Sequence, residues 1–358
     1  MINRAELKNF GPIKQLDWQN LGKINLIIGN NGCGKSFLLK ALYSAVRTLE
    51  DYKRGDNPDS VTDILKGKLY WTFQSEKIGD LVAKQNDAAL FFSLMLNEQE
   101  FSYSFGKDTV KAINSIENKV DPRSSNSIFL PAKEVLSIHQ IILEARQSRK
   151  IFGFDDTYFD LAKALIISEF DGFLNKFEKK GASISEHQNP IKGYNSDDFK
   201  KSRQLLENLI DGKIEYDEIE KRWYYKKGKQ RFSIGVTAEG IKKIAILDTL
   251  LGNGQLDEDS IVFIDEPESN LHPEAIAKLL DIIAILAKHG IQFFIASHSY
   301  FVIKKLFLIA QENKLSIPVL SKEGDAWQQS DLLDEMPENA IIEESIRLYE
   351  EEVGLAFK

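Results

Sequence analysis

The sequence predicts an α/β fold in which helices cover a mixed, largely parallel β-sheet. Buried strands are indicated by apolar runs at 24–28, 261–264, 292–296 and 317–320. Segments with a helical spacing of apolar residues follow the first three runs. Strands that alternate with helices usually pair in parallel, because the helix carries the chain back across the sheet.

The N-terminal region predicts an antiparallel β lobe beside this sheet. Residues 1–28 indicate a hairpin that turns at Gly11-Pro12, followed by the strand at 24–28. Further strands are expected at 68–74, 90–96, 101–105 and 128–130. The polar residues 97–100 separate two of them, which favours a second hairpin.

A segment with helical periodicity interrupts this pattern. Its apolar residues recur with helical spacing from Val135 to about Leu209, and a polar stretch at 179–196 breaks the periodicity. We therefore expect a discontinuous head, 1–135 and 226–358, with a helical insertion at 136–225. Heptads are not sustained over several repeats, so a long coiled-coil arm is not expected.

The loop after the first parallel strand is a phosphate-binding motif. It matches Gly-x4-Gly-Lys-Ser and reads Gly29-Asn30-Asn31-Gly32-Cys33-Gly34-Lys35-Ser36. Its glycines let backbone N–H groups curl around phosphate oxygens at the positive end of the following helix. Lys35 is expected to reach the β- and γ-phosphates, and the Ser36 hydroxyl to ligate Mg²⁺. The motif therefore predicts that the chain binds a nucleoside triphosphate and Mg²⁺.

Two further strands end in polar side chains that suit hydrolysis. Asp265 and Glu266 follow the apolar run 261–264 and would lie at the edge of the sheet where ligands bind in such folds. We expect Asp265 to hold Mg²⁺ through its water shell and Glu266 to act as the general base that polarises the attacking water. His298 ends the next strand, and its imidazole is expected near the γ-phosphate.

These three motifs, in this order, resemble those of ABC-type ATPases, specifically the SMC-like and OLD-like branch. The resemblance covers 1–135 and 226–350. Residues 9–13 are similar to the N-terminal hairpin of that branch, 265–273 to its acidic strand and D-loop, and 131–134 to the strand that leads into the inserted helices. Lys35 and Asp265 are 230 residues apart, a spacing that fits an inserted lobe.

In this family two heads sandwich ATP, and the signature helix of one subunit completes the site of the other. The resemblance implies that Ala238 and Gly240 offer backbone N–H groups to the γ-phosphate. Ala238 falls where the family usually has serine, and Glu239 falls where glycine is common. A carboxylate there is unfavourable unless it points away or meets a cation. The alternative is an ordinary helix N-terminus with Thr237 as its cap.

Several assignments stay open at this level. Gln74 and Gln140 are candidates for a metal-contacting Q-loop position, and Glu134 is expected nearby. The alternative, which is favoured for each of them, is an ordinary surface residue. Phe10 is expected in the core rather than against adenine. The basic and aromatic segment 221–231 favours a solvated hairpin around Lys227-Gly228. A nucleic-acid contact is its alternative interpretation.

Composition narrows the classes of function. The net charge of −8 argues against a broadly basic nucleic-acid-binding surface, and no run of eighteen apolar residues predicts a membrane span. The single cysteine, Cys33, and the polar N-terminal segment, which contains no visible secretory signal, favour the cytoplasm.

The resemblance implies an ATPase (ATP and water to ADP and phosphate) that acts as a nucleotide-driven, dimerising switch. OLD-like proteins often carry a nuclease domain after the ATPase, and no such domain is visible after His298. We therefore expect a second copy as one partner and a separately encoded effector, a nuclease or toxin, as another, in bacterial antiphage defence. The alternative function is an SMC-like DNA-repair or DNA-clamping ATPase, with DNA as the partner.

Overall fold

A six-stranded sheet forms the centre of the protein. The computed structural model describes residues 1–84, 88–109, 113, 115–166, 197–324 and 326–356. Strand order in the sheet is β14 (Ala326–Asp331), β13 (Pro318–Glu323), β3 (Ile24–Ile28), β12 (Gln292–Ser297), β11 (Ile261–Asp265) and β7 (Ser127–Leu130). All neighbours pair in parallel except the edge strand β14, which is antiparallel to β13. The predicted mixed, largely parallel sheet is confirmed.

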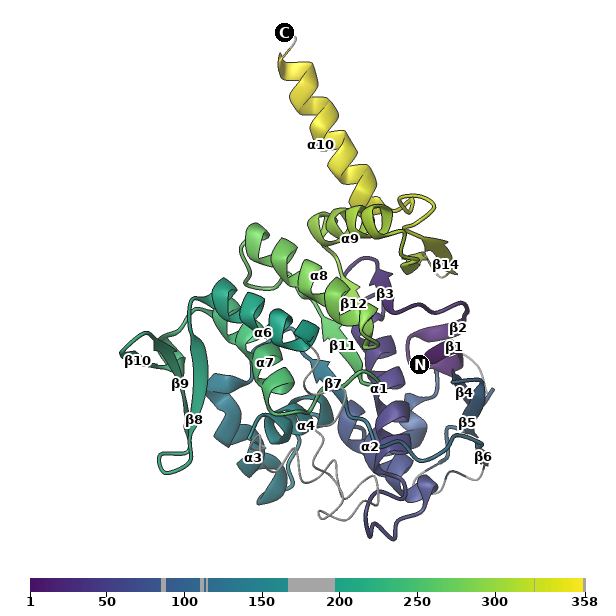
Figure 1. Cartoon of the computed structure of the whole chain (residues 1–358). Helices are drawn as coiled ribbons and strands as arrows, with labels where there is room; N and C mark the ends of the chain where they lie inside the picture. The colour runs from purple at the N-terminus through teal and green to yellow at the C-terminus, as the bar shows by residue number, and fades with distance from the viewer. Residues whose placement is uncertain (85–87, 110–112, 114, 167–196, 325, 357–358) are drawn as a thin grey trace.

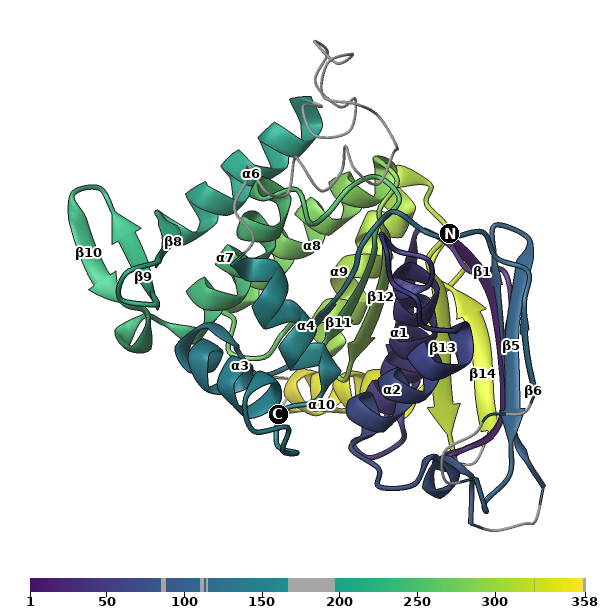
Figure 2. The same ribbon diagram turned by 90° about the horizontal axis from the view of Figure 1, so that it is seen from below.

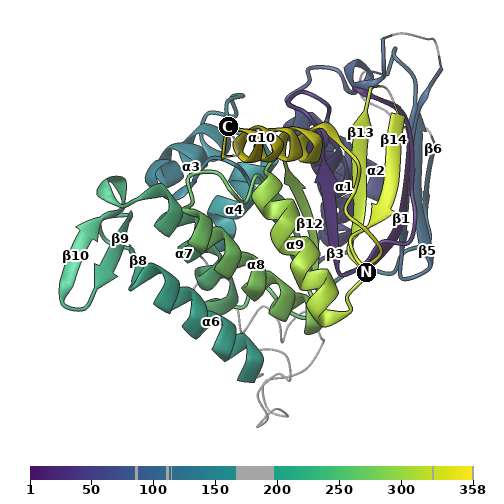
Figure 3. The same ribbon diagram turned by 90° about the horizontal axis from the view of Figure 1, so that it is seen from above.

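Helices cover both faces of this sheet. Below it in Figure 1 lie α1 (Lys35–Asp51) and α2 (Val61–Phe73), and above it lie α8 (Pro273–Lys288) and α9 (Tyr300–Asn313). Figures 2 and 3 show the two faces from opposite sides. Buried Tyr43 of α1 packs edge-on against Phe129 and Phe263 of the sheet, at ring distances of 5.6 and 5.8 Å. The central strands read as continuous apolar runs because they are buried on both faces.

The antiparallel lobe is present as predicted. Its sheet has the order β2 (Ile13–Trp18), β1 (Ile2–Phe10), β4 (Leu90–Leu96), β5 (Gln99–Phe105) and β6 (Ser115–Asn118). Phe92 of β4 stacks on Tyr103 of β5 with ring centroids 4.9 Å apart. Trp18 meets Phe294 of the central sheet edge-on at 5.8 Å, so the lobe and the central sheet share one core.

The strand predicted at 68–74 is wrong, because these residues belong to helix α2. Ser60 caps this helix and accepts a hydrogen bond from the backbone N–H of Asp63. The buried Leu65, Leu69 and Thr72 recur at helical spacing along one face. The aromatic residues at 70–73 have a high strand propensity, and the capping and packing of the helix override it. A short 3-10 turn (Ile78–Leu81) then leads to the lobe.

The predicted insertion, 136–225, is helical only in part. The helices among its described residues are α3 (His139–Gln147), α4 (Asp156–Leu165) and α6 (Asp197–Ile210). A 3-10 turn lies at its start (Leu136–Ile138), and another follows it at Ile234–Val236. An antiparallel sheet of β8 (Lys213–Asp217), β9 (Arg222–Lys227) and β10 (Gln230–Ser233) follows. The expected boundary at 225/226 therefore falls inside β9, and the polar stretch 179–196 lies outside the described residues.

The described residues of the insertion share the core of the central sheet. Its buried residues Ile142, Leu161 and Leu206 belong to the same apolar cluster as Ile264 of β11 and Phe293 of β12. Each of these side chains is at most 2% exposed. The division into head and insertion stays a prediction about sequence organisation.

Two helices complete the described chain. Helix α7 (Glu239–Gly252) packs beside α6, and α10 (Ala340–Ala356) projects from the body beyond α9 (Figure 1). On α10 only Ile342 is buried, whereas Ile346, Tyr349 and Leu355 are 52%, 66% and 69% exposed. Within the described ranges, none of the helices combines the length and the apolar character needed to cross a bilayer.

Candidate active site

Three neighbouring strands bring the predicted site residues to one edge of the central sheet. Because β3, β12 and β11 run in parallel, the segments that leave them start at the same C-terminal edge. The phosphate loop follows β3, Glu266 follows β11 and His298 follows β12. This edge therefore unites residues that are far apart in the sequence.

The phosphate loop has a backbone conformation that its glycines permit. Gly32 and Gly34 have φ values of 78° and 102°, which L side chains rarely adopt. Buried Lys35 donates from Nζ to the carbonyl oxygens of Gly29 at 2.7 Å and of Asn30 at 3.0 Å. The ammonium is thus held against the loop that would enclose a phosphate group.

The outer part of the loop is accessible. The side chains of Asn30, Asn31 and Ser36 are exposed, and Cys33 is half-buried. Lys322 of β13 donates from Nζ to the carbonyl oxygen of Cys33 at 3.1 Å, and this hydrogen bond connects the loop to the central sheet. The predicted phosphate-binding residues are therefore both fixed at the backbone and open to a ligand.

Asp265 and Ser36 lie together, as the prediction of a Mg²⁺ site requires. Burial raises the pKa of Asp265, while a hydrogen bond from Ser36 lowers it. The Oδ1 atom of Asp265 is buried and has no hydrogen-bond partner among the described residues. A hydroxyl and a carboxylate are ligands that suit Mg²⁺, which takes few protein ligands and keeps several waters. Among the described residues, no group of three or more His, Cys, Asp or Glu side chains lies together in a way that could hold a metal ion.

Glu266 is held in an uncommon backbone conformation. Its φ of 50° lies in the left-handed region, which costs energy for a residue with a side chain. Its backbone N–H donates to the carbonyl oxygen of Ala296 at 2.9 Å, and its own carbonyl accepts a hydrogen bond from Lys243 Nζ. The Ser269 hydroxyl donates to Glu266 Oε2 at 3.0 Å. Two of these contacts hold the backbone of Glu266, and the third holds its carboxylate.

His298 lies beside this carboxylate. Its Nδ1 is 3.4 Å from Glu266 Oε1 and 3.6 Å from Glu268 Oε1. The structure therefore brings the predicted general base and the predicted γ-phosphate contact side by side. Glu268 received no role in the sequence interpretation, which included it only within the D-loop segment.

Helix α7, which carries the predicted signature segment, packs at the same edge. Lys243 is buried beside β11, and burial lowers its pKa to about 8 although Glu268, Asp265 and Glu266 raise it. Lys242 pairs with Glu239 at 2.8 Å and with Glu134 at 3.4 Å. The Glu239 carboxylate is thus paired with a cation. A paired carboxylate is less unfavourable near a phosphate than an unpaired one.

The start of α7 shows that the alternative interpretation, in which Thr237 caps the helix, is wrong. Ala238, not Thr237, is the N-cap, and no side chain caps the helix. The Thr237 hydroxyl instead donates to the carbonyl oxygen of Ser233 at 3.3 Å. Gly240 is closely packed, because a Cβ there would lie 2.9 Å from the carbonyl oxygen of Asn270. The first backbone N–H groups of α7 are therefore not satisfied by a cap and suit an anion.

The Q-loop candidates occupy different places. Gln74 is the C-cap of α2, and Gln140 of α3 donates to the Tyr216 hydroxyl at 2.8 Å. Glu134 pairs with Lys242 rather than with the phosphate loop. Phe10 is fully buried, as expected for a core residue. None of these contacts supports a metal-binding role for Gln74, Gln140 or Glu134.

The basic segment 221–231 forms the predicted hairpin, with β9 and β10 joined at Lys227-Gly228. Several of its cations are paired within the same small sheet. Lys226 lies 3.2 Å from Glu215, Lys227 lies 2.5 Å from Asp211, and Arg231 lies 2.7 Å from Asp217. These pairs favour a solvated hairpin over a nucleic-acid contact.

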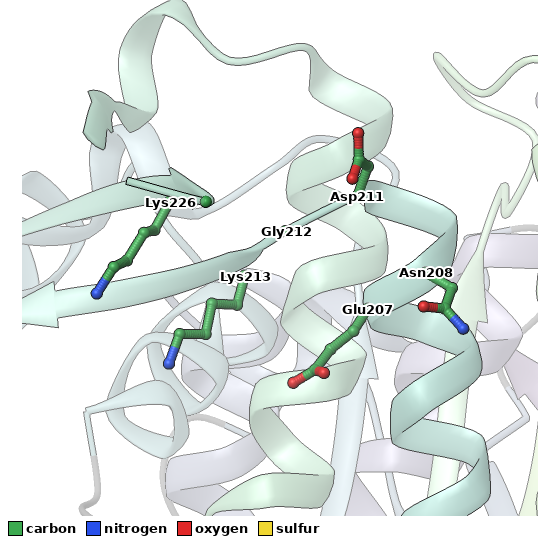
Figure 4. A pocket seen from close by; sticks show the side chains of 7 residues that line it. Glu207, Asn208, Asp211, Gly212, Lys213 and Lys226 are labelled. Carbon is green, nitrogen blue, oxygen red and sulfur yellow. The ribbon is translucent and has the colours of Figure 1, made fainter. Parts of the chain in front are cut away.

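A pocket of about 350 Å³ lies near this hairpin and away from the sheet edge. It is lined by α6, β8 and β9, including Glu207, Lys213 and Lys226. In Figure 4 the side chains of Asp211 and Asn208 point away from those of Lys213 and Lys226. The charged groups do not converge on a common centre, so the pocket does not compete with the sheet edge as the functional site.

Comparisons with known proteins give the family of this chain and a curated relative. The family described as "AAA domain, putative AbiEii toxin, Type IV TA system" matches residues 24–304, a range that includes all three motifs. One curated relative, an uncharacterized protein (MJECL10) of Methanocaldococcus jannaschii, is 33% identical over 104 residues. That match covers 28% of this chain and 44% of the relative, so the chain spans less than half of the relative's length.

Solved structures of SMC heads have the same fold. An Smc head bound to the C-terminal winged-helix domain of ScpA superposes with a TM-score of 0.54 at 14% identity, covering 92% of this chain and 97% of that chain. An Smc head with an extended coiled coil, bound to the C-terminal domain of ScpA from Pyrococcus furiosus, gives a TM-score of 0.49 at 12% identity over 98% of both chains. The first of these likenesses shows that the chain has the SMC-head form of the ABC-type ATPase fold.

Proposed function

We propose that this chain, which belongs to the AAA domain family matched above, is an ABC-type P-loop ATPase. In this proposal it hydrolyses ATP in a nucleotide-driven dimer that controls a separate effector protein. The observation that carries the proposal is the convergence of Lys35, Asp265, Glu266 and His298 at one sheet edge. In particular, Glu266 Oε1 lies 3.4 Å from His298 Nδ1. A base beside a second polar group, both next to a phosphate loop, is the arrangement that hydrolysis of a phosphoanhydride needs.

Each residue has one role in this proposal. Lys35 contacts the β- and γ-phosphates, and Ser36 and Asp265 hold Mg²⁺, which neutralises charge on the phosphates when it is bound. Glu266 accepts a proton from the attacking water, and His298 hydrogen-bonds the γ-phosphate or that water.

A second copy of the chain completes the site in this proposal. The uncapped N-terminus of α7, at Ala238 and Gly240, offers N–H groups to the γ-phosphate held by the partner's loop. The pairing of Glu239 with Lys242 at 2.8 Å lowers the repulsion between this segment and a phosphate. ATP would then act as the contact that closes the dimer, and hydrolysis would open it.

The effector role is supported by two observations. The family's description refers to a toxin of a type IV toxin–antitoxin system, that is, to a system with a second component, which supports a partner protein. In addition, α10 presents exposed apolar residues at 346, 349 and 355 that no other described residue covers. Surfaces of this kind are commonly protein-binding surfaces.

A mixing experiment tests completion of the site by a second copy. Lys35→Ala removes the phosphate contact of one half-site, and Ala238→Asp places a carboxylate at the α7 N-terminus while remaining a good N-cap. Position 238 is preferable to Gly240, where any Cβ would clash with the chain's own D-loop. Ala238→Asn is the matched control, because it has the same size and capping ability without the charge.

Each homodimer of Lys35→Ala or Ala238→Asp should be inactive, and their equimolar mixture should regain about a quarter of wild-type turnover. This value follows from random pairing, in which half of the dimers are mixed and each contains one intact site. Failure of well-formed heterodimers to hydrolyse ATP would exclude completion in trans.

The effector is tested by coexpression with the product of the neighbouring gene. Glu266→Gln with ATP should bind that protein, and Lys35→Ala should not, because only the first variant can form the closed dimer. Equal binding by both variants would show that the interaction is not controlled by nucleotide.

A further inference from the structure

We propose that Glu268 is a positioning residue that holds His298 beside Glu266, an inference that rests on the proposed ATPase function. Glu268 lies in the loop between β11 and α8, and its side chain is only 11% exposed. Its Oε1 atom accepts hydrogen bonds from the Ser297 hydroxyl at 2.8 Å and from the backbone N–H of His298 at 3.1 Å. One carboxylate oxygen therefore joins the loop after β11 to the end of β12.

The imidazole depends on this anchor. The His298 side chain is 42% exposed, so packing alone does not fix its orientation. Its Nδ1 faces Glu266 Oε1 at 3.4 Å and Glu268 Oε1 at 3.6 Å. This leaves Nε2, on the opposite side of the ring, directed away from both carboxylates. Glu268 thus sets both the backbone from which the ring projects and the side of the ring that faces the general base.

The local energetics argue against a purely structural role. The second oxygen of Glu268, Oε2, is buried and has no hydrogen-bond partner among the described residues. A buried carboxylate oxygen without a partner costs free energy of folding. Lys243 offsets part of this cost through its charge, since Glu268 is the carboxylate that raises the pKa of Lys243 most. Residues that violate the ordinary rules of stability are typical of functional sites.

The test compares Glu268→Ala with Glu268→Gln. Alanine removes the acceptor, whereas glutamine keeps a carbonyl oxygen that can accept the same two hydrogen bonds. We expect Glu268→Ala to lower kcat about tenfold to 10²-fold with KM changed less than about threefold, because a misplaced group mainly affects the transition state. Glu268→Gln should restore kcat to within about threefold of wild type. The matched control is Glu274→Ala, which removes an exposed glutamate from α8.

A double variant separates positioning from an independent effect. If Glu268 acts through His298, the variant carrying both Glu268→Ala and His298→Ala should hydrolyse ATP no more slowly than His298→Ala alone. Additive losses would overturn the proposal, as would a kcat of Glu268→Ala equal to wild type or a Glu268→Gln variant as slow as Glu268→Ala.

A second measurement does not depend on turnover. The chain contains five histidines, so the imidazole signal of His298 can be assigned in an NMR spectrum from its loss in His298→Ala. In Glu268→Ala this signal should move to the position of a free, solvated histidine, whereas Glu268→Gln and Glu274→Ala should leave it in place. An unchanged signal in a folded Glu268→Ala variant would overturn the positioning role. Absence of hydrolysis by the wild type would instead contradict the proposed function, and the NMR result would still decide the role of Glu268.

Discussion

The acidic edge of the sheet, which carries Asp265, Glu266 and Glu268, and the ion cluster between α1, α2 and α4 both bury carboxylates, but the acidic edge leaves two carboxylate oxygens without a hydrogen-bond partner among the described residues. The ion cluster consists of Arg47, Asp51, Lys68 and Asp160. Lys68 Nζ lies 3.1 Å from both Asp51 and Asp160, and Arg47 lies 3.3 Å from Asp51 and 3.6 Å from Asp160. At the acidic edge, by contrast, Asp265 Oδ1 and Glu268 Oε2 are buried without hydrogen-bond partners among the described residues.

The pKa values of two aspartates reflect this difference. Burial alone would raise the pKa of Asp160, but Lys68 and Arg47 outweigh it and hold the pKa well below its usual range. Burial raises the pKa of Asp265, and the hydrogen bond from Ser36 and the nearby lysines do not outweigh it. Cations of the chain itself thus compensate the carboxylates of the ion cluster, whereas we propose that Mg²⁺ compensates the buried charge of Asp265.

Among the substitutions that test this contrast, the largest expected effect is on the free energy of unfolding. Asp160→Ala should lower the free energy of unfolding by about 3–5 kcal/mol, because it leaves Lys68 and Arg47 buried with too few anions. Denaturant titration followed by circular dichroism measures this change, and nucleotide affinity of the folded variant should be nearly unchanged. A loss below about 1 kcal/mol would show that the ion cluster contributes no more than a surface pair.

The second effect is on catalysis. Asp265→Asn should lower ATP turnover about 10²-fold, which corresponds to ~3 kcal/mol of activation free energy. Its free energy of unfolding should stay equal to or above that of wild type, because the substitution removes a charge that burial disfavours and whose Oδ1 atom has no hydrogen-bond partner among the described residues. If Asp265→Asn instead destabilises the chain as much as Asp160→Ala, the contrast between the two regions does not hold.

The third effect is on the pH dependence of stability. Asp160 has a lowered pKa in the folded state, so its stabilisation is complete above the unfolded pKa of about 4 and is lost as the pH falls below it. The difference in unfolding free energy between wild type and Asp160→Ala should therefore narrow as the pH falls below about 4. A difference that widens below about pH 4 would contradict the direction of this shift.

The smallest effect concerns a neutral neighbour of the ion cluster. The Tyr43 hydroxyl donates to Asp160 at 2.9 Å, and Tyr43→Phe removes this bond while the ring still packs on the sheet. We expect a loss of about 1 kcal/mol in unfolding free energy, the usual contribution of one hydrogen bond. A loss as large as that of Asp160→Ala would mean that the hydroxyl, rather than the cations, holds Asp160.

Much of the fold could be predicted from local patterns. The apolar runs at 24–28, 261–264 and 292–296 are strands because each is buried on both faces, which leaves a clear signal in the sequence. The strand predicted at 68–74 is wrong because the aromatic residues of this segment favour strands. The Ser60 cap and the packing of Leu65 and Leu69 stabilise a helix there instead.

The candidate site also contains parts that could be predicted from the sequence and parts that could not. Its motifs could be located because each is contiguous in the sequence, although the roles of Lys35, Asp265, Glu266 and His298 stay predictions. Glu268 and Lys243 could not be found, because their contacts join segments 29 and 23 residues apart. The ion cluster was also missed, since Tyr43 and Asp160 are 117 positions apart and helix surfaces offer many charges that could pair.

ATP turnover by Glu266→Gln, measured together with its oligomeric state in ATP, tests the central claim most directly. Glutamine keeps the size of the side chain and removes its ability to accept a proton. We expect a variant that binds ATP, remains a closed dimer and hydrolyses ATP about 10²-fold more slowly than wild type. Turnover equal to wild type would show that Glu266 is not the general base and would contradict the assignment of this sheet edge as the hydrolytic site.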